Sequence, residues 1–163
     1  MADHAEIRRA TRADIPVVLE LIHALAEYEK LAHLVRADAA LLADELFGAS
    51  SPAETLLCIA QNRAVGFAVY FHNFSTFMGR KGLFLEDLFV RPEQRGRGYG
   101  KALFMHVART AHERGCGRFE WLVLDWNAPS IRFYESLGAE RMDDWRLFRL
   151  SGDALSDLAR ETA

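Results

Sequence analysis

The sequence has little cysteine and no long apolar segment. Its 163 residues include only two cysteines, Cys58 and Cys116, whose spacing matches no metal-ligand motif. We therefore expect a reduced cytoplasmic protein that holds no metal. No apolar run approaches the roughly 20 residues that span a membrane, and the first residues carry mixed charges without the apolar core of a signal peptide. These absences argue against a membrane protein and against a secreted one.

Basic residues are not in excess either. Lysine and arginine together number 20, and aspartate and glutamate number 23, which gives a formal net charge of −3. Proteins that bind nucleic acid usually carry a basic excess, so we expect no nucleic-acid partner. The length and the apolar fraction of 50% predict a single domain over residues 1–163 with a hydrophobic core of its own.

The spacing of apolar residues predicts alternating strands and helices, and therefore a mixed sheet with helices on both faces. Residues 82–90 are apolar on both faces, which is typical of a central strand, whereas residues 73–81 are expected to form a loop. In the second predicted helix, Leu41, Leu42 and Leu46 are expected to face inward. The predicted strands cover residues 6–9, 55–60, 64–72, 82–90, 118–124 and 145–150, and the predicted helices cover residues 14–30, 38–47, 98–114 and 129–137.

A glycine-rich, basic turn lies between the central strand and the helix that follows it. From Arg91 to Lys101 the chain has four basic residues and one acidic residue, a local charge of +3. Glycines let the backbone approach a ligand closely, and the first N–H groups of a helix bind anions. The turn therefore predicts a phosphate-bearing ligand, and the alternative is a helix entry with a solvated basic face. The spacing excludes a Walker loop, which needs glycine in place of Arg95, and a dinucleotide fingerprint, which needs glycine in place of Lys101.

Two adjacent carboxylates, Glu86 and Asp87, interrupt the central strand. The alternation of a strand predicts that their side chains point to opposite faces of the sheet. Because an unpaired charge is costly to desolvate, each carboxylate must be paired or lie in a cleft. Two alternatives remain open for each of them, a functional site or an ion pair with an arginine such as Arg132 or Arg146.

Tyr134 also has two interpretations. It lies three residues from both Ile131 and Leu137, a spacing that fits a core aromatic residue on the predicted helix. A phenol is also able to protonate a thiolate, so the second interpretation is a general acid.

Three segments, in this order, resemble the signatures of the GNAT acetyltransferase superfamily. They are the strand Leu85–Val90, the turn Arg95-x-x-Gly98-x-Gly100, and Asn127 followed by Tyr134-x-x-x-Gly138. Further segments resemble the spermidine/spermine N-acetyltransferase group, and within it the branch that acts on thialysine. The segments that resemble the group are 26–31, 70–71, 85–87 and 145–148, and those closest to the thialysine branch are 74–77 and 124–127.

The resemblance implies the GNAT fold, of the α/β (α+β) class, with a central mixed, mostly antiparallel sheet and helices on both faces. It also implies an acetyl-CoA-dependent N-acetyltransferase. The expected acceptor is the primary amine of a small cationic substrate (a thialysine-like amino acid, a diamine or a polyamine), with direct transfer in a ternary complex and a homodimeric protein. The alternatives are a protein lysine or N-terminal acetyltransferase and a non-catalytic coenzyme A-binding module.

The resemblance also assigns roles to residues. It implies that Glu86 is the general base and Tyr134 the general acid. The residues expected to bind the cofactor are Leu88, Phe89, Val90, Arg95, Gly96, Arg97, Gly98, Tyr99, Gly100, Lys101, Asn127, Ser130 and Tyr134. Those expected to bind the amine substrate are Tyr28, Glu29, Glu86, Asp87 and Asp144.

Overall fold

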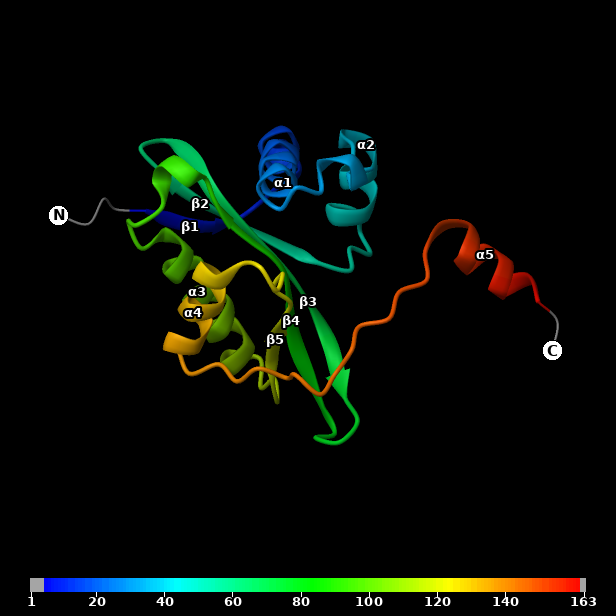
Figure 1. Ribbon diagram of the computed structural model, residues 1–163. Helices are drawn as coiled ribbons and strands as arrows, with labels where there is room; N and C mark the ends of the chain where they lie inside the picture. The colour runs from blue at the N-terminus through cyan, green and yellow to red at the C-terminus, as the bar shows by residue number, and fades with distance from the viewer. Residues whose placement is uncertain (1–4, 162–163) are drawn as a thin grey trace. The chain divides into compact units, whose positions relative to one another are not determined.

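The structure, a computed structural model, describes residues 5–161 and divides into two compact units that meet in sequence between Leu122 and Val123 (Figure 1). The first unit contains strands β1 (Glu6–Arg9), β2 (Glu54–Ala60), β3 (Arg63–Ser75), β4 (Arg80–Val90) and β5 (Phe119–Trp121), and helices α1 (Ile15–Tyr28), α2 (Ala39–Leu41) and α3 (Tyr99–Glu113). Short 3-10 turns cover Arg12–Asp14, Ala32–Leu34 and Pro92–Gln94, and a π-helical turn covers Leu42–Leu46. The second unit contains α4 (Ala128–Ser136) and α5 (Gly152–Arg160).

The five strands form one sheet in the order β1-β2-β3-β4-β5. The first three pairs are antiparallel and β4–β5 is parallel, which confirms the predicted mixed, mostly antiparallel sheet. The expected loop over residues 73–81 is wrong for most of its length, because β3 continues to Ser75 and pairs with β4 from Arg80 onward. The hairpin turn itself contains only residues 76–79.

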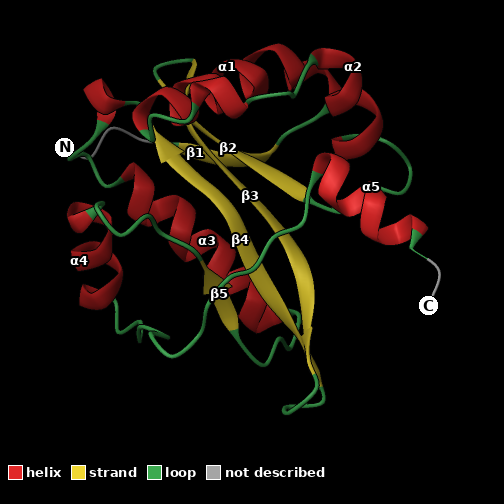
Figure 2. Cartoon of the chain, turned by 45° about the vertical axis from the view of Figure 1, so that its right-hand side comes forward, coloured by secondary structure: helices red, strands yellow, loops and turns green. Residues whose placement is uncertain are grey.

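Helices cover both faces of this sheet, as predicted (Figures 1 and 2). On one face, Val18 and Leu21 of α1 pack into a core with Leu57, Phe67, Val69 and Phe89. On the other face, the ring of Phe104 of α3 packs against two rings of β5. Its centroid is 5.1 Å from that of Phe119 and 4.9 Å from that of Trp121. The two faces are named below the α1 face and the α3 face.

β4 contains a bulge at Glu86. Val69 of β3 pairs with Asp87, but the next residue of β3, Tyr70, pairs with Leu85, so Glu86 has no partner in the ladder. The extra residue shifts the alternation of side chains by one. Glu86 and Asp87 therefore share the α1 face, where Val69 lies, and the prediction that they point to opposite faces is wrong.

The second predicted helix is shorter than expected and continues as the π-helical turn. Asp38 caps α2 by accepting a hydrogen bond from the N–H of Leu41 at 2.8 Å. Leu42 is buried as predicted, but Leu41 is 49% exposed, so the prediction that it faces inward is wrong. Leu42 and Leu46 are four residues apart and share one side, whereas adjacent helical residues are turned about 100° from each other.

In the second unit, α4 agrees with the predicted helix to within one residue at each end. The predicted strand over 145–150 is wrong: no strand forms there, and all six residues are exposed. An alternating pattern becomes a strand only where a neighbouring strand supplies hydrogen bonds, and no described strand pairs with this segment. For the same reason β5 ends at Trp121, where its pairing ends, and not at residue 124.

Cys58 is fully buried in the sheet, as expected of a core residue. None of the helices within residues 5–161 is long and apolar enough to cross a membrane.

Candidate active site

β4 extends past the end of its parallel partner. The pairing with β5 ends at Leu85 and Trp121, five residues before β4 ends at Val90. Among the described strands, none pairs with this edge of residues 86–90. An unpaired edge offers its peptide groups to a ligand, and the predicted cofactor residues Leu88 and Phe89 lie on this stretch together with Val90.

The glycine-rich turn after β4 has the backbone of an anion site. Gly96 and Gly98 have φ angles of 77° and 85°, in the left-handed region that glycine adopts without strain. Gly98 is the N-cap of α3, whose first turn carries no acidic side chain. The N-terminal peptide N–H groups of α3 therefore provide a favourable potential for a phosphate group.

Arg95 connects this turn to β4 and to α1. Its Nε donates a hydrogen bond to the carbonyl oxygen of Val90 at 3.0 Å, and its guanidinium lies 4.1 Å from the centroid of the Tyr28 ring. Arg91 is also engaged within the protein, because it pairs with Glu20 at 2.8 Å. These contacts lead us to expect that the main chain of the turn, rather than these two guanidinium groups, meets a bound anion first.

The other residues of the turn differ in exposure. Gly96, Arg97 and Gly98 are exposed before α3, and Lys101 is exposed in its first turn. Tyr99, in contrast, is 4% exposed and belongs to the core. The Tyr99 hydroxyl is buried without a hydrogen-bond partner among the described residues. Gly100 lies next to Val90, whose side chain would be 3.7 Å from an added Cβ.

Three carboxylates gather on the α1 face. Glu29 follows the last residue of α1, and Glu86 and Asp87 lie at the bulge of β4. Burial raises the pKa of Asp87 to about 7, and the negative charges of Glu86 and Glu29 add to this effect. Burial also raises the pKa of Glu29. The three groups thus form a region of unbalanced negative charge that suits a cationic ligand.

No cation of the first unit pairs with the bulge carboxylates. Among its described residues, none forms a hydrogen bond or an ion pair with the side chain of Glu86 or Asp87. Glu86 is exposed, and Asp87 is partly buried. Tyr28 packs against this part of β4, since its ring centroid is 6.5 Å from that of Phe89.

The first unit therefore brings together most of the residues that the sequence singled out. Two features were not predicted: the bulge, which places both carboxylates on one face, and the stack of Arg95 on Tyr28. No residue near Glu86 signals a bulge, since the strand contains neither glycine nor proline between Gly82 and Val90.

The remaining predicted residues, Asn127, Ser130, Tyr134 and Asp144, belong to the second unit. Asn127 caps α4, where its Oδ1 accepts a hydrogen bond from the N–H of Ser130 at 3.4 Å. Tyr134 is partly buried, and its ring centroid is 5.2 Å from that of Phe133. Asp144 is exposed in a turn closed by the Trp145 N–H and the Met142 carbonyl.

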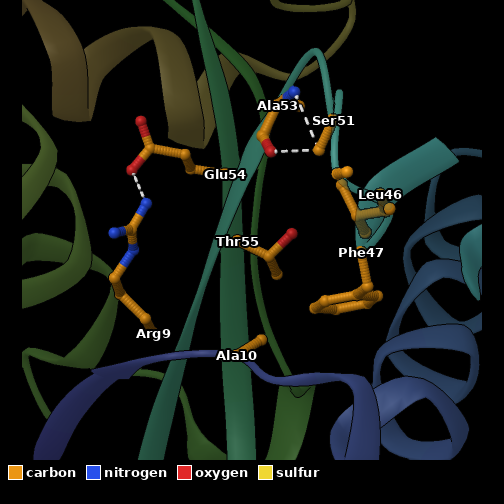
Figure 3. A pocket seen from close by; sticks show the side chains of 10 residues that line it. Arg9, Ala10, Leu46, Phe47, Ser51, Ala53, Glu54 and Thr55 are labelled. Atoms are coloured by element: carbon orange, nitrogen blue, oxygen red, sulfur yellow. Dashed lines mark hydrogen bonds and ion pairs between the residues drawn. The ribbon is translucent and has the colours of Figure 1, made fainter.

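A pocket of about 360 Å³ lies at the start of β2 in the first unit (Figure 3). Leu46 and Phe47 line it on one side, Thr55 lies at its centre, and Arg9 pairs with Glu54 at the other side. The Thr55 hydroxyl is buried without a hydrogen-bond partner among the described residues. None of the predicted site residues lines this pocket.

Within residues 5–161, no group of three or more histidine, cysteine, aspartate and glutamate side chains is arranged to hold a metal ion.

Comparison with known proteins gives one consistent family. Residues 18–139 match the model of the acetyltransferase (GNAT) family. The chain is 35% identical to the L-ornithine N5-acetyltransferase of Arabidopsis thaliana, over 93% of this chain and 86% of that protein. It is 36% identical to the thialysine N-epsilon-acetyltransferase of Bos taurus, over 94% of this chain and 96% of that protein.

Solved structures agree on the fold. An integron cassette protein from the mobile metagenome of V. cholerae superposes with a TM-score of 0.82 at 25% identity, over 99% of both chains. An aminoglycoside acetyltransferase from an uncultured soil metagenomic sample superposes with a TM-score of 0.76 at 18% identity, over 90% of this chain and 97% of that one. The family match and the two relatives above 30% identity cover most of this sequence, so the chain belongs to the GNAT acetyltransferase family and is an N-acetyltransferase.

Proposed function

We propose that this chain moves the acetyl group of acetyl-CoA to a primary amine of a small cationic acceptor, by direct transfer in a ternary complex. The observation that carries the proposal is the cluster of Glu29, Glu86 and Asp87 beside the open edge of β4. An ammonium group bound there would offset part of the negative charge of the cluster. Relatives at about 35% identity are named for thialysine and L-ornithine, which are small cationic amino acids.

The cofactor is proposed to lie along the open edge of β4 and over the turn that follows. The peptide groups of Leu88–Val90 would hydrogen-bond the pantetheine arm and polarise the thioester carbonyl. The turn Gly96–Lys101 would hold the pyrophosphate through main-chain N–H groups at the start of α3. In the second unit, Asn127 and Ser130 are proposed to contact the cofactor as well.

The acceptor amine needs a base before it reacts. An alkyl ammonium with a pKa near 10.4 is neutral in only about one molecule in a thousand at pH 7. We assign Glu86 to contact the ammonium and to draw off its proton through a water molecule, because Glu86 is exposed on the α1 face at the bulge. Tyr28, Glu29, Asp87 and Asp144 are proposed to bind the rest of the acceptor.

Tyr134 is proposed to protonate the thiolate that leaves. A phenol is a competent donor to a thiolate whose conjugate acid has a pKa near 8.5. In this scheme no residue is acetylated, because the amine attacks the thioester directly. The protein is further proposed to work in the cytoplasm as a homodimer.

The test is thiol release from acetyl-CoA by the purified protein with a panel of amines: thialysine, ornithine, lysine, putrescine, spermidine and spermine. We expect turnover with at least one of them, and a large loss of turnover with little loss of acetyl-CoA binding in Glu86→Gln. The matched control is Glu27→Gln, which removes the same charge from an exposed position of α1. Acetyl-CoA binding without turnover of any amine, together with acetylation of a peptide library, would favour a protein acceptor instead.

A further inference from the structure

Asp87 is placed to take part in proton transfer, a role that the family resemblance gives to Glu86. The bulge places Glu86 on the same face as Asp87, one residue away along the strand. In a regular strand Glu86 would face α3, on the opposite face from Asp87, which shares its face with Phe89 and Val69. A ligand at the bulge would therefore be near both carboxylates, and Asp87 is the more buried of the two.

The groups around Asp87 carry little compensating positive charge. Glu86 lies beside Asp87 on β4, and the negative charge of Glu29, at the end of α1, also raises the pKa of Asp87. The partner of Asp87 on β3 is the apolar residue Val69. The guanidinium of Arg95, which lies on this side of the sheet, is held over the Tyr28 ring and by the carbonyl of Val90. Burial and the two negative charges all favour the protonated form of Asp87, and raise its pKa to about 7.

We infer that Asp87 is the final acceptor of the proton that leaves the amine, while Glu86 and a water molecule carry that proton to it. The inference rests on the proposed function, because it requires an ammonium group at the bulge. A base whose proton affinity is matched to the working pH both accepts the proton from the ammonium and releases it to solvent afterwards.

The N–H bond of the ammonium breaks, its electron pair stays on nitrogen, and an O–H bond forms on Asp87. The neutral amine attacks the thioester carbonyl carbon, the C–S bond breaks with its electron pair on sulfur, and the thiolate takes a proton from Tyr134. The nitrogen then returns its second proton to the Tyr134 phenolate. Asp87 releases the first proton to solvent, so one proton is produced per acetylated ammonium.

The test compares the pH dependence of kcat/KM in four proteins: the unmodified chain, Asp87→Asn, Glu86→Gln and Glu27→Gln. In the unmodified chain and in Glu27→Gln, we expect kcat/KM to rise up to about pH 7 and then to level off. In Glu86→Gln, kcat/KM should reach a lower plateau but should keep the break, the change of slope at which kcat/KM levels off near neutral pH. Asp87→Asn should lose the break, because it reacts only with amine that is already neutral in solution.

The size of this difference follows from the amine. The neutral fraction of an alkyl amine grows about a hundredfold between pH 7 and pH 9. Asp87→Asn should therefore gain about a hundredfold in kcat/KM over this range, whereas the unmodified chain should change by less than about threefold. If Asp87→Asn keeps the break, or if Glu86→Gln loses it, the inference is wrong.

A second measurement needs no turnover. Carbon-13 spectra of aspartate carboxyl groups in the free protein should show one signal that titrates near pH 7, and Asp87→Asn should lack that signal. A titration midpoint below about pH 5 in a protein that does acetylate amines would overturn the inference and leave the proposed function standing. If no amine is acetylated, the proposed function fails first, and the inference fails with it.

Discussion

Replacing Asp87 by asparagine is predicted to stabilise the protein at neutral and alkaline pH while it lowers the activity at neutral pH. The ordinary pKa of an aspartate carboxyl is 3.8, and burial beside Glu86 and Glu29 raises that of Asp87 to about 7. Between these two values the folded protein holds a proton that the unfolded chain has lost. The free energy of unfolding must therefore decrease as the pH rises through this window. Asparagine has nearly the same shape and carries no charge, so the variant lacks this decrease.

The magnitude follows from the two pKa values. At about 1.4 kcal/mol per pH unit, the difference between 3.8 and about 7 corresponds to about 4 kcal/mol as an upper limit. About 2.5 kcal/mol of that limit develops between pH 5 and pH 8. Because the side chain is only partly buried, solvent reduces the effect. We expect the gain in stability of Asp87→Asn to be larger at pH 8 than at pH 5 by about 1–2.5 kcal/mol.

The assay is urea unfolding at pH 5 and pH 8, followed by tryptophan fluorescence and circular dichroism. Other groups also titrate in this range, but they are common to both proteins and cancel in the difference. Glu27→Gln is the control, and its stability should stay within about 0.5 kcal/mol of the unmodified chain at both pH values. An Asp87→Asn variant that is less stable at pH 8 than the unmodified chain, or whose gain is independent of pH, would refute the electrostatic reasoning.

Two further predictions concern the turn after β4 and the start of the first helix. Gly98→Ala places a Cβ at a φ of 85°, which should cost about 1–2 kcal/mol of stability and raise the Kd for acetyl-CoA in a calorimetric titration. An unchanged Kd would show that the backbone of the turn is not used. Arg8 binds Asp14 with two hydrogen bonds of 2.9 and 2.8 Å and holds the pKa of that carboxyl well below its usual range. Asp14 therefore contributes stability above about pH 4 that is lost as the pH falls. Arg8→Ala should cost about 1 kcal/mol at pH 6, and the cost should shrink as the pH is lowered to 3, as measured by urea unfolding; a cost that is the same at both pH values would contradict this.

Local signals in the sequence were sufficient for most of the sheet. Gln61 and Asn62 lie between the strands predicted over 55–60 and 64–72, and both adopt the positive φ angles, 50° and 58°, that a tight hairpin turn requires. The glycine turn before α3 was likewise recognisable, since Gly96 and Gly98 occupy positions where other residues would be strained. In these places the chemistry of one or two residues decides the local backbone.

Features that depend on distant partners could not be predicted. The bulge at Glu86 is set by the register between β3 and β4, which no residue of β4 specifies alone. Residues 145–150 carry a strand-like pattern but no described strand pairs with them. The candidate site shows the same division. The sequence identified Glu29, Glu86 and Asp87 as candidate residues. Their common face and the high pKa of Asp87 arise only from the packing of α1 on the bulged strand.

The position of Arg95 links the two halves of the candidate site energetically. The side chain of Arg95 holds the last carbonyl of β4, which precedes the proposed cofactor turn, and lies over the ring of Tyr28, which is proposed to bind the acceptor. A ligand that draws this guanidinium away must also uncover Tyr28, and an acceptor that moves Tyr28 must also loosen the turn. Such linkage is reciprocal, so the change in affinity that the first substrate causes in the second equals the change that the second causes in the first. The contact between Arg95 and Tyr28 thereby provides a single stacked pair through which the affinities for the two proposed substrates would be coupled.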